Sequence, residues 1–427
     1  MKDIIQSIIL ENQYFDYPEM VQRKMKIPVN QGVIISIMGV RRSGKTFLLY
    51  DAIQRLLQMG TPKENIIFIN FEDERINLDV STLHLIIESY TELYPDIQLK
   101  NTSFFFDEVQ NIPGWEKFVR RVYDTKTRNI YITGSNSRYL SKEIATELRG
   151  RTLPFTLFPL SFSEFLDFSG IDKRLYPQSQ KSRIINYMQQ FLTDGGFPEV
   201  QIIDKQYRTR LLQQYFNVMI FRDIVERYQV SNVEELKFFI KKIFAGVTKP
   251  FSVNKAYNDL RSLGYKVSNK YLYDYLTYCN DVFLCQNVNR FDYSEIKQNK
   301  SDKKQYIIDT GLLHAIEFSV SQNKGKLLEN MVFLEFLKQE KQVFYHKEVN
   351  ECDFVIRSGN EYKPVQVCWK LNDETTQKRE FTGLKSACDY LHTDQGLIIT
   401  FDEKRQARFR GKSFEIIPVY EYFLQNG

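Results

Sequence analysis

The sequence predicts an α/β fold at its N-terminal end, and three consecutive segments support that prediction. Residues 33–39, VIISIMG, form an apolar run of strand length, which suits a strand buried on both faces. Residues 39–46, GVRRSGKT, match the pattern GxxxxGK(S/T). Residues 46–57, TFLLYDAIQRLL, carry apolar residues at helical spacing. A strand, a glycine-rich loop and a helix in this order are typical of a phosphate-binding loop, so we expect a nucleotide site here.

The residue types of this loop explain how it would hold a nucleotide. Glycine lets successive backbone N–H groups turn towards phosphate oxygens, and the following helix adds the positive end of its dipole. Lys45 would reach the β- and γ-phosphates, and the Thr46 hydroxyl would hold Mg²⁺. Arg41 and Arg42 would raise the positive potential, contact a neighbouring subunit or be solvated loop residues. The expected nucleotide-binding residues are Gly39, Arg41, Arg42, Ser43, Gly44, Lys45, Thr46 and Phe47.

Two further apolar segments end in polar residues suited to hydrolysis. Residues 103–110, SFFFDEVQ, predict a strand that ends at Asp107 and Glu108. Asp107 fits the carboxylate that holds Mg²⁺ through water, and Glu108 fits the base that orients the attacking water. Residues 129–136, NIYITGSN, predict another strand. Its polar end, from Thr133 to Asn136, would sense the γ-phosphate, unless it is an ordinary turn.

The composition is that of a globular protein of several domains. The chain has 427 residues, of which 43% are hydrophobic and 26% are charged. Lys and Arg (58) exceed Asp and Glu (53) by only 5, which does not indicate a particular partner. No apolar run is long enough to span a membrane, and the first residues lack the features of a signal peptide. The five cysteines show no CxxC pair and no zinc spacing, so we expect reduced thiols in a cytoplasmic protein.

Three longer segments carry a resemblance to a known family. They are DEVQNIPGWEKFVRRVYD (107–124), ITGSNSRYLSKEIATELRGR (132–151) and GGFPEV (195–200). Together they resemble a prokaryotic family of AAA/STAND-like P-loop ATPases. Its members join the ATPase to a winged helix and a C-terminal domain of uncharacterised function. The resemblance covers nearly the whole chain, and the DExQN and LRGR stretches are its most specific signatures.

The resemblance implies a fold and several site residues. The fold is a P-loop NTPase of the ASCE type, a doubly wound parallel sheet in which the third strand above lies between the first two. ATP is the implied nucleotide, and Asn136 would face its γ-phosphate together with Glu108. Arg149 and Arg151 occupy the place of arginine fingers, acting on the same chain or on a neighbour, with a surface ion pair as the alternative. Residues 196–198 resemble a turn that couples the nucleotide to the next domain, or are a simple turn.

The middle of the chain predicts a helical lid followed by a winged helix. Residues 205–229 and 234–247 carry apolar residues at helical spacing. Within residues 252–293, Gly264 ends a first helix, Ser268 caps a second one, and alternating apolar residues then begin a wing.

The winged helix is compatible with DNA binding or with a packing or oligomerisation role. In the DNA-binding interpretation, Asn269, Lys270 and Tyr273 on the second helix would enter the major groove. Side chains around them would contact phosphates. These are Lys255, Arg261, Lys266 and Arg290.

The C-terminal part predicts an amphipathic helix over residues 325–339, several strands, a second helix over 375–390 and a further strand. This order resembles the restriction-endonuclease-like, or PD-(D/E)xK, core. Glu329 and Asp353 fit its helix acid and first strand acid, which hold a divalent metal. The second strand should read Glu-x-Lys, but here it reads Gln366-Val367-Cys368. We therefore expect a degenerate, inactive site, unless Lys370, an even number of positions from Cys368, replaces the missing lysine.

These observations predict four domains. They are a P-loop ATPase domain (1–160), a helical lid region (161–247), a winged helix-turn-helix (248–310) and a nuclease-like domain (311–427). The expected function is Mg²⁺-dependent ATP binding and hydrolysis that drives a conformational switch, coupled to a DNA- or protein-recognition module. Three alternatives remain: an AAA-type oligomeric motor that remodels DNA or protein, a DNA-binding regulator or mobile-element accessory that uses ATP as a ligand, and an ATP-gated nuclease. We expect no membrane partner, and ATP-dependent oligomerisation would fit the motor.

Overall fold

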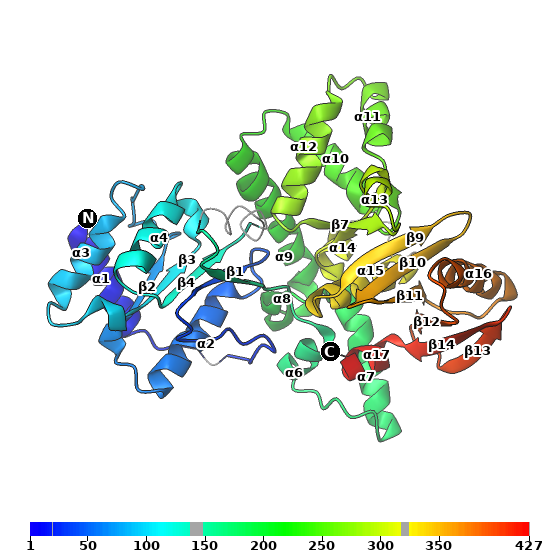
Figure 1. The fold of residues 1–427 in the computed structure, drawn as a ribbon, viewed down its shortest axis with the longest axis horizontal. Helices are drawn as coiled ribbons and strands as arrows, with labels where there is room; N and C mark the ends of the chain where they lie inside the picture. The colour runs from blue at the N-terminus through cyan, green and yellow to red at the C-terminus, as the bar shows by residue number, and fades with distance from the viewer. Residues whose placement is uncertain (19, 137–147, 317–323, 427) are drawn as a thin grey trace. The chain divides into compact units, whose positions relative to one another are not determined.

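The computed structural model of the protein describes residues 1–18, 20–136, 148–316 and 324–426. The chain divides into two compact units, Met1–Phe158 and Pro159–Gly427, which Figure 1 shows in blue to cyan and in green to red. Each unit has its own sheet and is described by itself.

The first unit contains a five-stranded parallel sheet in the order β2-β3-β4-β1-β5. The strands are β1 (Ile34–Met38), β2 (Ile66–Asn70), β3 (Ser103–Asp107), β4 (Ile130–Gly134) and β5 (Thr152–Thr156). Strand β4 lies between β1 and β3, as the resemblance implied. The prediction of an α/β fold with a parallel sheet is therefore confirmed for this unit.

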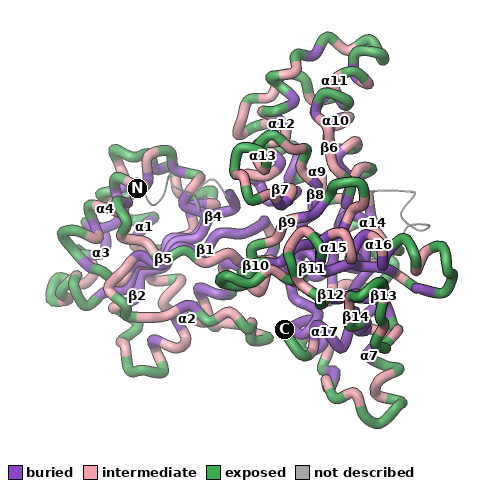
Figure 2. Tube along the Cα trace, turned by 45° about the vertical axis from the view of Figure 1, so that its right-hand side comes forward, coloured by how far each residue is buried: buried purple, intermediate pink, exposed green. Residues whose placement is uncertain are grey.

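Helices cover both faces of this sheet. They are α1 (Lys2–Gln13), α2 (Lys45–Gln58), α3 (His84–Leu93) and α4 (Trp115–Thr125), with short 3-10 segments η1 (Lys63–Asn65), η2 (Leu99–Asn101) and η3 (Val109–Asn111). Side chains of a strand alternate between faces. Phe105 lies in the core beneath α2 and stacks on Tyr131 at 4.4 Å, whereas Phe104 contacts Tyr90 of α3 and Phe106 contacts Phe118 of α4. Because both faces are covered, the central strands are buried along their length (Figure 2).

The second unit is built on a nine-stranded mixed sheet in the order β13-β14-β12-β11-β10-β9-β7-β8-β6. Its strands are β6 (Pro250–Phe251), β7 (Cys285–Arg290), β8 (Lys303–Ile307), β9 (Gln342–Lys347), β10 (Glu351–Ser358), β11 (Glu361–Cys368), β12 (Gln395–Thr400), β13 (Arg405–Phe409) and β14 (Lys412–Pro418). Strands β7 and β9 pair in parallel, so the sheet runs across the domain boundary predicted at residue 310.

The helices of the second unit fall into two groups. Those before the sheet's first long strand are α6 (Phe162–Phe168), α7 (Gln178–Asp194), α8 (Pro198–Ile202), α9 (Lys205–Val218), the π-helical segment η5 (Met219–Glu226), α10 (Val233–Ala245), α11 (Val253–Ser262) and α12 (Asn269–Asp281). The later ones are α13 (Glu295–Lys300), α14 (Thr310–Ile316), α15 (Lys324–Lys338), α16 (Glu374–Tyr390) and α17 (Val419–Asn426). Ser268 caps α12 by accepting from Tyr271 N–H, as predicted, and the helix continues to Asp281.

Helix α15 is not amphipathic, contrary to the prediction from its sequence. Every residue from Leu327 to Phe336 is buried, because α15 packs against β8, β9 and β11 on one side and against α7 and α14 on others. Phe333 and Phe336 contact Phe354 of β10. The opposite face of the sheet is covered by α16, whose Phe381 and neighbouring residues pack on β10, β11 and β12.

No helix within the described ranges is both long enough and apolar enough to cross a membrane. All five cysteines are buried and carry free thiols.

Candidate functional site

The glycine-rich loop lies at the carboxyl end of the parallel sheet, between β1 and α2. Gly39 N–H donates to Gly134 O at 3.2 Å, which places the loop beside the end of β4. A Cβ atom on Gly39 would lie 2.1 Å from Leu157 O, so only glycine fits there. Gly44 has φ of +96°, a conformation that favours glycine. The carboxyl end of a parallel sheet is where ligands of such folds bind.

Four predicted site residues lie together at this edge. Lys45 Nζ lies 3.2 Å from Glu108 Oε1, and the Thr46 hydroxyl donates to Asp107 Oδ2 at 2.7 Å. Lys45, Asp107 and Glu108 are all buried. The structure therefore brings the expected phosphate-binding lysine, metal-binding residues and base into direct contact.

Two polar side chains of neighbouring segments orient the carboxylates. The Thr133 hydroxyl donates to Asp107 Oδ1 and accepts from Glu108 N–H at 2.9 Å. Gln110 donates through Nε2 to Glu108 Oε2 and to the Ser135 hydroxyl. Glu108 has φ of +54°, a strained conformation for a residue with a side chain, of the kind that clusters at functional sites. Sequence reasoning missed Gln110, although its position two residues after Glu108 was the available signal.

Burial and neighbouring charges shift the two carboxyl groups in opposite directions. Burial, together with the charge of Glu108, raises the pKa of Asp107 to about 6. Burial also acts to raise the pKa of Glu108, but the Lys45 ammonium and the hydrogen bond from Gln110 outweigh it and hold that pKa below its usual value. Glu108 is thus ionised at neutral pH, as a base must be.

The residues present fit a magnesium nucleotide. A threonine hydroxyl and a carboxylate facing each other are oxygen ligands of the kind that Mg²⁺ binds beside phosphates. The Ser43 hydroxyl is buried and has no hydrogen-bond partner within the described ranges, which leaves a donor for a phosphate oxygen. Such a group would supply the phosphoryl bond to be cleaved, while Lys45 would stabilise its charge and Glu108 would orient water.

Arg41 of the loop has a partner in the same unit, and an arginine of the N-terminal segment also contacts the loop. Arg41 forms an ion pair with Glu72 at 2.9 Å, and Arg42 is exposed with φ of +69°. Arg23, which sequence reasoning missed, donates to Ser43 O at 2.9 Å and to Phe158 O at 2.8 Å. Arg23 therefore braces the loop from the N-terminal segment, and no motif in that segment marked it.

Two further predicted site residues lie near the loop. Phe47 directly follows it in the chain, and Asn136 follows the neighbouring strand β4. Asn136 is buried two residues beyond β4, at the carboxyl end of the sheet. Phe47 is 50% exposed and contacts Tyr50 edge-on, with ring centroids 5.9 Å apart. Residues 137–147, which make up much of the second resembling segment (132–151), lie outside the described residues.

The structure does not bring Arg149 and Arg151 to the phosphate loop. Arg151 directly precedes β5, at the amino end of the sheet, because Ile34 N–H donates to Arg151 O. The loop follows the other end of β1, about 16 Å away at ~3.3 Å per strand residue. Arg151 pairs with Asp124 at 3.1 Å and lies over the Tyr123 ring, and Arg149 is exposed. A finger acting on this chain's own nucleotide does not fit these positions.

Replacing Asp107 by asparagine should stabilise the metal-free protein, and the gain should grow as the pH rises from 3.8 to about 6. The folded protein keeps a proton on Asp107 up to about pH 6, whereas the unfolded chain releases it near 3.8. The carboxyl therefore disfavours the folded state increasingly through this window, by up to roughly 3 kcal/mol, and is constant above it. Thermal unfolding midpoints in EDTA across this pH range measure the difference. Parallel curves for the two proteins would contradict the raised pKa.

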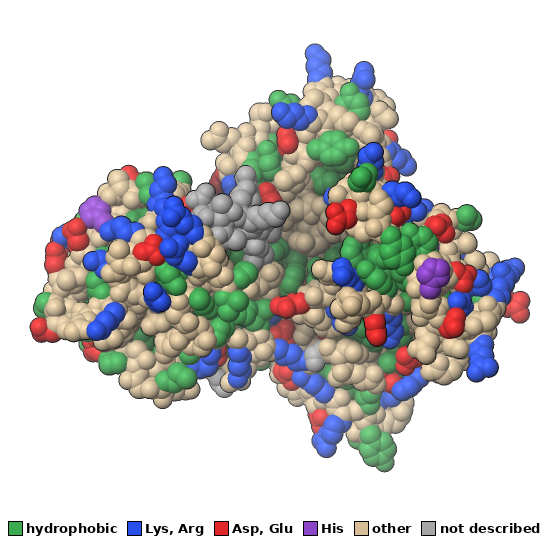
Figure 3. Space-filling view, viewed as in Figure 1, with side chains coloured by type: hydrophobic (Ala, Val, Ile, Leu, Met, Phe, Trp, Pro, Cys, Tyr) green, Lys and Arg blue, Asp and Glu red, His purple; other side chains and the backbone are tan. Residues whose placement is uncertain are grey.

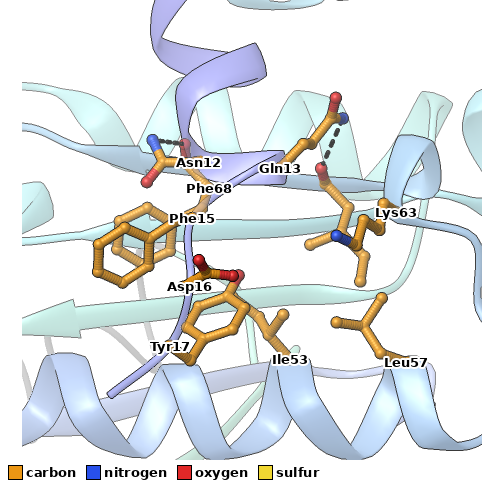
Figure 4. A pocket seen from close by; sticks show the side chains of 10 residues that line it. Asn12, Gln13, Phe15, Asp16, Tyr17, Ile53, Leu57, Lys63 and Phe68 are labelled. Carbon is orange, nitrogen blue, oxygen red and sulfur yellow. Dashed lines mark hydrogen bonds between the residues drawn. The ribbon is translucent and has the colours of Figure 1, made fainter.

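A separate pocket of about 160 Å³ lies between the end of α1 and helix α2 (Figure 4). The amides of Asn12 and Gln13 donate to Phe68 O and Ile66 O and hold the end of α1 against β2. The pocket is lined by Asn12, Gln13, Phe15, Asp16, Tyr17, Ile53, Leu57, Lys63, Ile66 and Phe68. None of the loop residues 39–46 lines it, so it is not the phosphate site.

In the second unit, the structure brings together three of the four residues predicted for a nuclease-like site. Glu329, Asp353 and Gln366 are buried near one another, on α15, β10 and β11. Lys370 lies beyond the last residue of β11 and is exposed, so it does not share the strand face that its spacing suggested. The lysine among the acids is instead Lys304 of β8, which sequence reasoning missed.

The helices α11 and α12 present a polar, aromatic outer face. Lys266 and Lys270 are exposed, and Tyr273 is 51% exposed. Figure 3 shows lysine, arginine and apolar side chains on the part of the surface formed by these helices, at the top of the view. Arg290 differs from them because it lies within the sheet, opposite Tyr345 of β9, with its Nε atom buried.

Three family models together match most of the chain. A model described as an AAA domain matches residues 31–166. Two models described as domains of unknown function, DUF8612 and DUF4143, match residues 185–324 and 324–422. The first unit thus contains an AAA domain with its phosphate-binding loop.

Solved structures give only a weak likeness. The chain aligns with Orc1 of Aeropyrum pernix in complex with DNA at a TM-score of 0.30 and 10% identity, over 75% of this chain and 93% of that one. It aligns with Cdc6p of Pyrobaculum aerophilum at a TM-score of 0.28 and 14% identity, over 78% of this chain and 93% of that one. These scores are too low to bear on function.

Two curated relatives match nearly the full length of the chain. The uncharacterized protein MJ1544 of Methanocaldococcus jannaschii is 35% identical over 99% of this chain and 96% of its own. An uncharacterized protein of Haemophilus influenzae is 31% identical over 91% of this chain and 94% of its own. The chain therefore belongs to the family of AAA-domain proteins that includes MJ1544 and this Haemophilus protein.

Proposed function

We propose that the protein is a Mg²⁺-dependent ATPase whose hydrolysis cycle switches the conformation of a recognition module. The observation that carries this proposal is the contact of Lys45 with Glu108 and of Thr46 with Asp107, at 3.2 and 2.7 Å. A phosphate-binding lysine and a base in one ion pair, beside a hydroxyl and a carboxylate suited to Mg²⁺, are the groups that ATP hydrolysis requires.

The ion pair suggests how the nucleotide would act on the site. Without a nucleotide, Lys45 neutralises Glu108. The β- and γ-phosphates of ATP carry more negative charge and would draw the ammonium away from the carboxylate. Glu108, still held by Gln110, would then be free to accept a hydrogen bond from the attacking water. Arrival of the γ-phosphate would thereby be sensed at the ends of β3 and β4, where Thr133 and Asn136 lie.

The recognition module is proposed to be the winged helix of residues 248–310, with DNA as its partner. Helices α11 and α12, the hairpin of β7 and β8, and the exposed Lys266, Lys270 and Tyr273 support this assignment. The flanking regions are proposed as a lid (161–247) and a degenerate nuclease-like domain (311–427) without nuclease activity. A protein partner on the same face is the alternative.

A second candidate function is that of an oligomeric AAA-type motor. Arg149 and Arg151 favour it, because they lie at the edge of the sheet opposite this chain's own loop. An arginine at that position reaches a γ-phosphate only if the nucleotide belongs to a neighbouring molecule. The regulator that uses ATP as a ligand would have the same site but a slow turnover.

ATP turnover should be measurable with Mg²⁺ and should rise several-fold when double-stranded DNA is added. The measurement is phosphate release at several protein concentrations, with Lys45→Ala as the blank. In Lys266→Ala/Lys270→Ala, basal turnover should persist while the DNA stimulation is lost, because these side chains lie far from the loop in sequence and outside the first unit.

The matched control is Lys363→Ala/Lys378→Ala, which removes the same charge from exposed positions on β11 and α16. Turnover per chain that rises with protein concentration would favour the motor. No turnover above the Lys45→Ala blank under any condition would refute the ATPase, and equal stimulation of both double variants would refute the DNA-binding face.

A further inference from the structure

A lysine is buried among three carboxylates in the second unit. Lys304 Nζ lies 2.9 Å from Glu351 Oε1, 3.3 Å from Glu329 Oε1 and 3.4 Å from Asp353 Oδ1. The Lys304 side chain is 0% exposed, so no solvent screens its charge. A buried charge of this kind needs such partners to be tolerated.

The strand geometry fixes the lysine in this position. Lys304 is the second residue of β8, and it lies opposite Val288 of β7 on one side and Pro250 of β6 on the other. Side chains two residues apart share a strand face, so Lys304 and Tyr306 both face α15. The Tyr306 hydroxyl donates to Glu329 Oε1 at 2.7 Å, and the Tyr345 ring lies 5.5 Å from Lys304 Nζ. The strand backbone therefore fixes the position of Lys304, and the carboxylates and the Tyr345 ring stabilise its ammonium group.

An irregularity in the sheet aims Asp353 at the lysine. The register of β10 against β9 shifts between Cys352 and Val355. Such bulges redirect a side chain, and here Cys352 packs under α16 while Asp353 turns to Lys304. Asp353 Oδ2 also accepts from Val367 N–H at 2.9 Å, which fixes the carboxyl group in place.

The charges of the cluster depend on one another. Burial acts to lower the pKa of Lys304, but the surrounding carboxylates outweigh it and hold that pKa above its usual value. Burial raises the pKa of Asp353, and the nearby Glu329 adds to this effect. Glu351 is also paired with Lys347 at 3.0 Å, so it has a second cation at the rim of the cluster.

The donor set does not fit a divalent metal. A nuclease of the proposed fold would hold its metal between the helix acid and the strand acid, Glu329 and Asp353. The Lys304 ammonium fills that place, and a metal with ligand distances of about 2.0–2.4 Å would meet its charge directly.

Gln366, the third residue of the predicted nuclease-like site, already forms hydrogen bonds with protein groups. Gln366 accepts from Asp353 N–H at 3.2 Å and donates to Glu380 Oε2 at 2.5 Å, so both its amide oxygen and its amide nitrogen are engaged in hydrogen bonds. A glutamate at this position would place a like charge against Glu380. Within the described ranges, no group of three or more His, Cys, Asp or Glu residues is arranged to hold a metal.

We propose that Lys304 is a built-in counter-cation at the position where a nuclease of this fold would bind a divalent metal, so that the acid cluster binds no metal and cleaves no nucleic acid. The lysine comes from the hairpin that precedes the acids in the chain and stabilises their negative charge as the metal would. This inference rests on the proposed nuclease-like fold of residues 311–427 and not on the proposed ATPase activity.

Removing the lysine should therefore convert the cluster into a metal site. In Lys304→Met, the acids lose their cation, so thermal unfolding should move several degrees lower, and Mn²⁺ should reverse that shift. The matched control is Lys303→Met, the same change on the adjacent residue, whose side chain lies on the other strand face. Every protein in the comparison carries Asp107→Asn, so that the nucleotide site contributes no metal effect.

The inference holds if Mn²⁺ raises the unfolding temperature of Lys304→Met but not that of Lys303→Met or of the parent protein. Mn²⁺ binding by the parent protein that disappears in Asp353→Asn would overturn it. So would Mn²⁺-dependent nicking of supercoiled DNA that disappears in Asp353→Asn, because Lys304 would then serve an active nuclease. Equal stability of Lys304→Met and Lys303→Met without Mn²⁺ uptake would also overturn it.

A second variant covers the case in which Lys304→Met does not fold. Lys304→Met/Glu329→Gln/Asp353→Asn removes the cation together with two of the acids, and Lys347 still pairs with the remaining Glu351. This variant should fold and ignore Mn²⁺, because no uncompensated charge is left. Failure of the triple variant to fold would show that the lysine has some other role and would overturn the inference.

Discussion

Glu108→Gln is expected to lower ATP turnover by about 10²–10⁴-fold while ATP still binds. Glutamine has nearly the shape of glutamate and can still bond to Gln110, but it cannot accept a proton from water. It also releases Lys45 from its ion pair of 3.2 Å, so ATP should bind at least as tightly as in the unchanged protein. Single-turnover phosphate release and a nucleotide-binding titration measure the two effects separately.

The control for this prediction is Glu64→Gln, the same chemical change at an exposed position of the first unit. It should leave both measurements unchanged. Gln110→Ala should give a smaller loss of turnover, because it removes only the group that orients Glu108. Normal turnover in Glu108→Gln would mean that another group orients the water, and weaker ATP binding would mean that Glu108 contacts the nucleotide itself.

Gly196→Ala is expected to destabilise the second unit by about 2–4 kcal/mol, which corresponds to a fall of roughly 5–10 °C in its unfolding midpoint. A Cβ atom on Gly196 would lie 2.4 Å from Leu160 O. Gly196 also accepts from Leu160 N–H at 2.7 Å and donates to the buried Asp309 Oδ2 at 2.6 Å. The added methyl group forces these segments apart and breaks bonds that no water can replace. Differential scanning calorimetry measures the change.

Gly325→Ala is the matched control, because a Cβ atom there meets nothing within 4 Å and alanine favours the helix it would join. It should be neutral or slightly stabilising. ATP affinity in the first unit should be normal in both variants. Unchanged unfolding of Gly196→Ala would refute the structural role, and a loss of ATP turnover without a loss of stability would support the coupling turn that its sequence resembles.

The nucleotide site could be predicted from the sequence because its residues are local to strand ends. The loop from Gly39 to Thr46 needs one strand, one turn and one helix, all adjacent in the chain. Asp107 and Glu108 end a run of phenylalanines whose burial on both faces follows from composition alone. Parallel strands then bring these ends to one edge of the sheet, so the contact of Thr46 with Asp107 required no further information.

Apart from Gln110, the residues that sequence reasoning missed depend on contacts between distant segments. Arg23 reaches the loop from 20 positions before Ser43, and no periodicity links the two. Lys304 lies 49 residues before Asp353 and on the other side of the predicted boundary at residue 310, so no local pattern links it to the acids. The alternation of Lys304 and Tyr306 in a short strand was the only local signal.

The place of Arg149 and Arg151 and the burial of helix α15 also depend on more than one element. Arg149 and Arg151 match the arginines of a family motif that acts on the same chain or on a neighbour, and only the register of β5 against β1 places them at the far edge of the sheet, where the second alternative fits. Helix α15 was expected to be amphipathic, and it does contain the polar residues Glu329, Asn330 and Glu335. Those side chains are buried as well, because the helix is enclosed on several sides. The hydrophobic pattern of a helix does not reveal how many other elements pack against it.

The parallel pairing of β7 with β9 limits how the chain can be divided in the laboratory. A fragment ending near residue 310 would keep β7 but lose the strand that covers its edge, and a fragment starting there would expose β9 and leave the acids without Lys304. Open, apolar strand edges pair with other chains and aggregate. Helices α11 and α12 and the C-terminal strands should thus be expressed as one piece, from Pro159 onward. Tests of DNA binding on the shorter fragment would report the behaviour of an incomplete sheet with exposed strand edges.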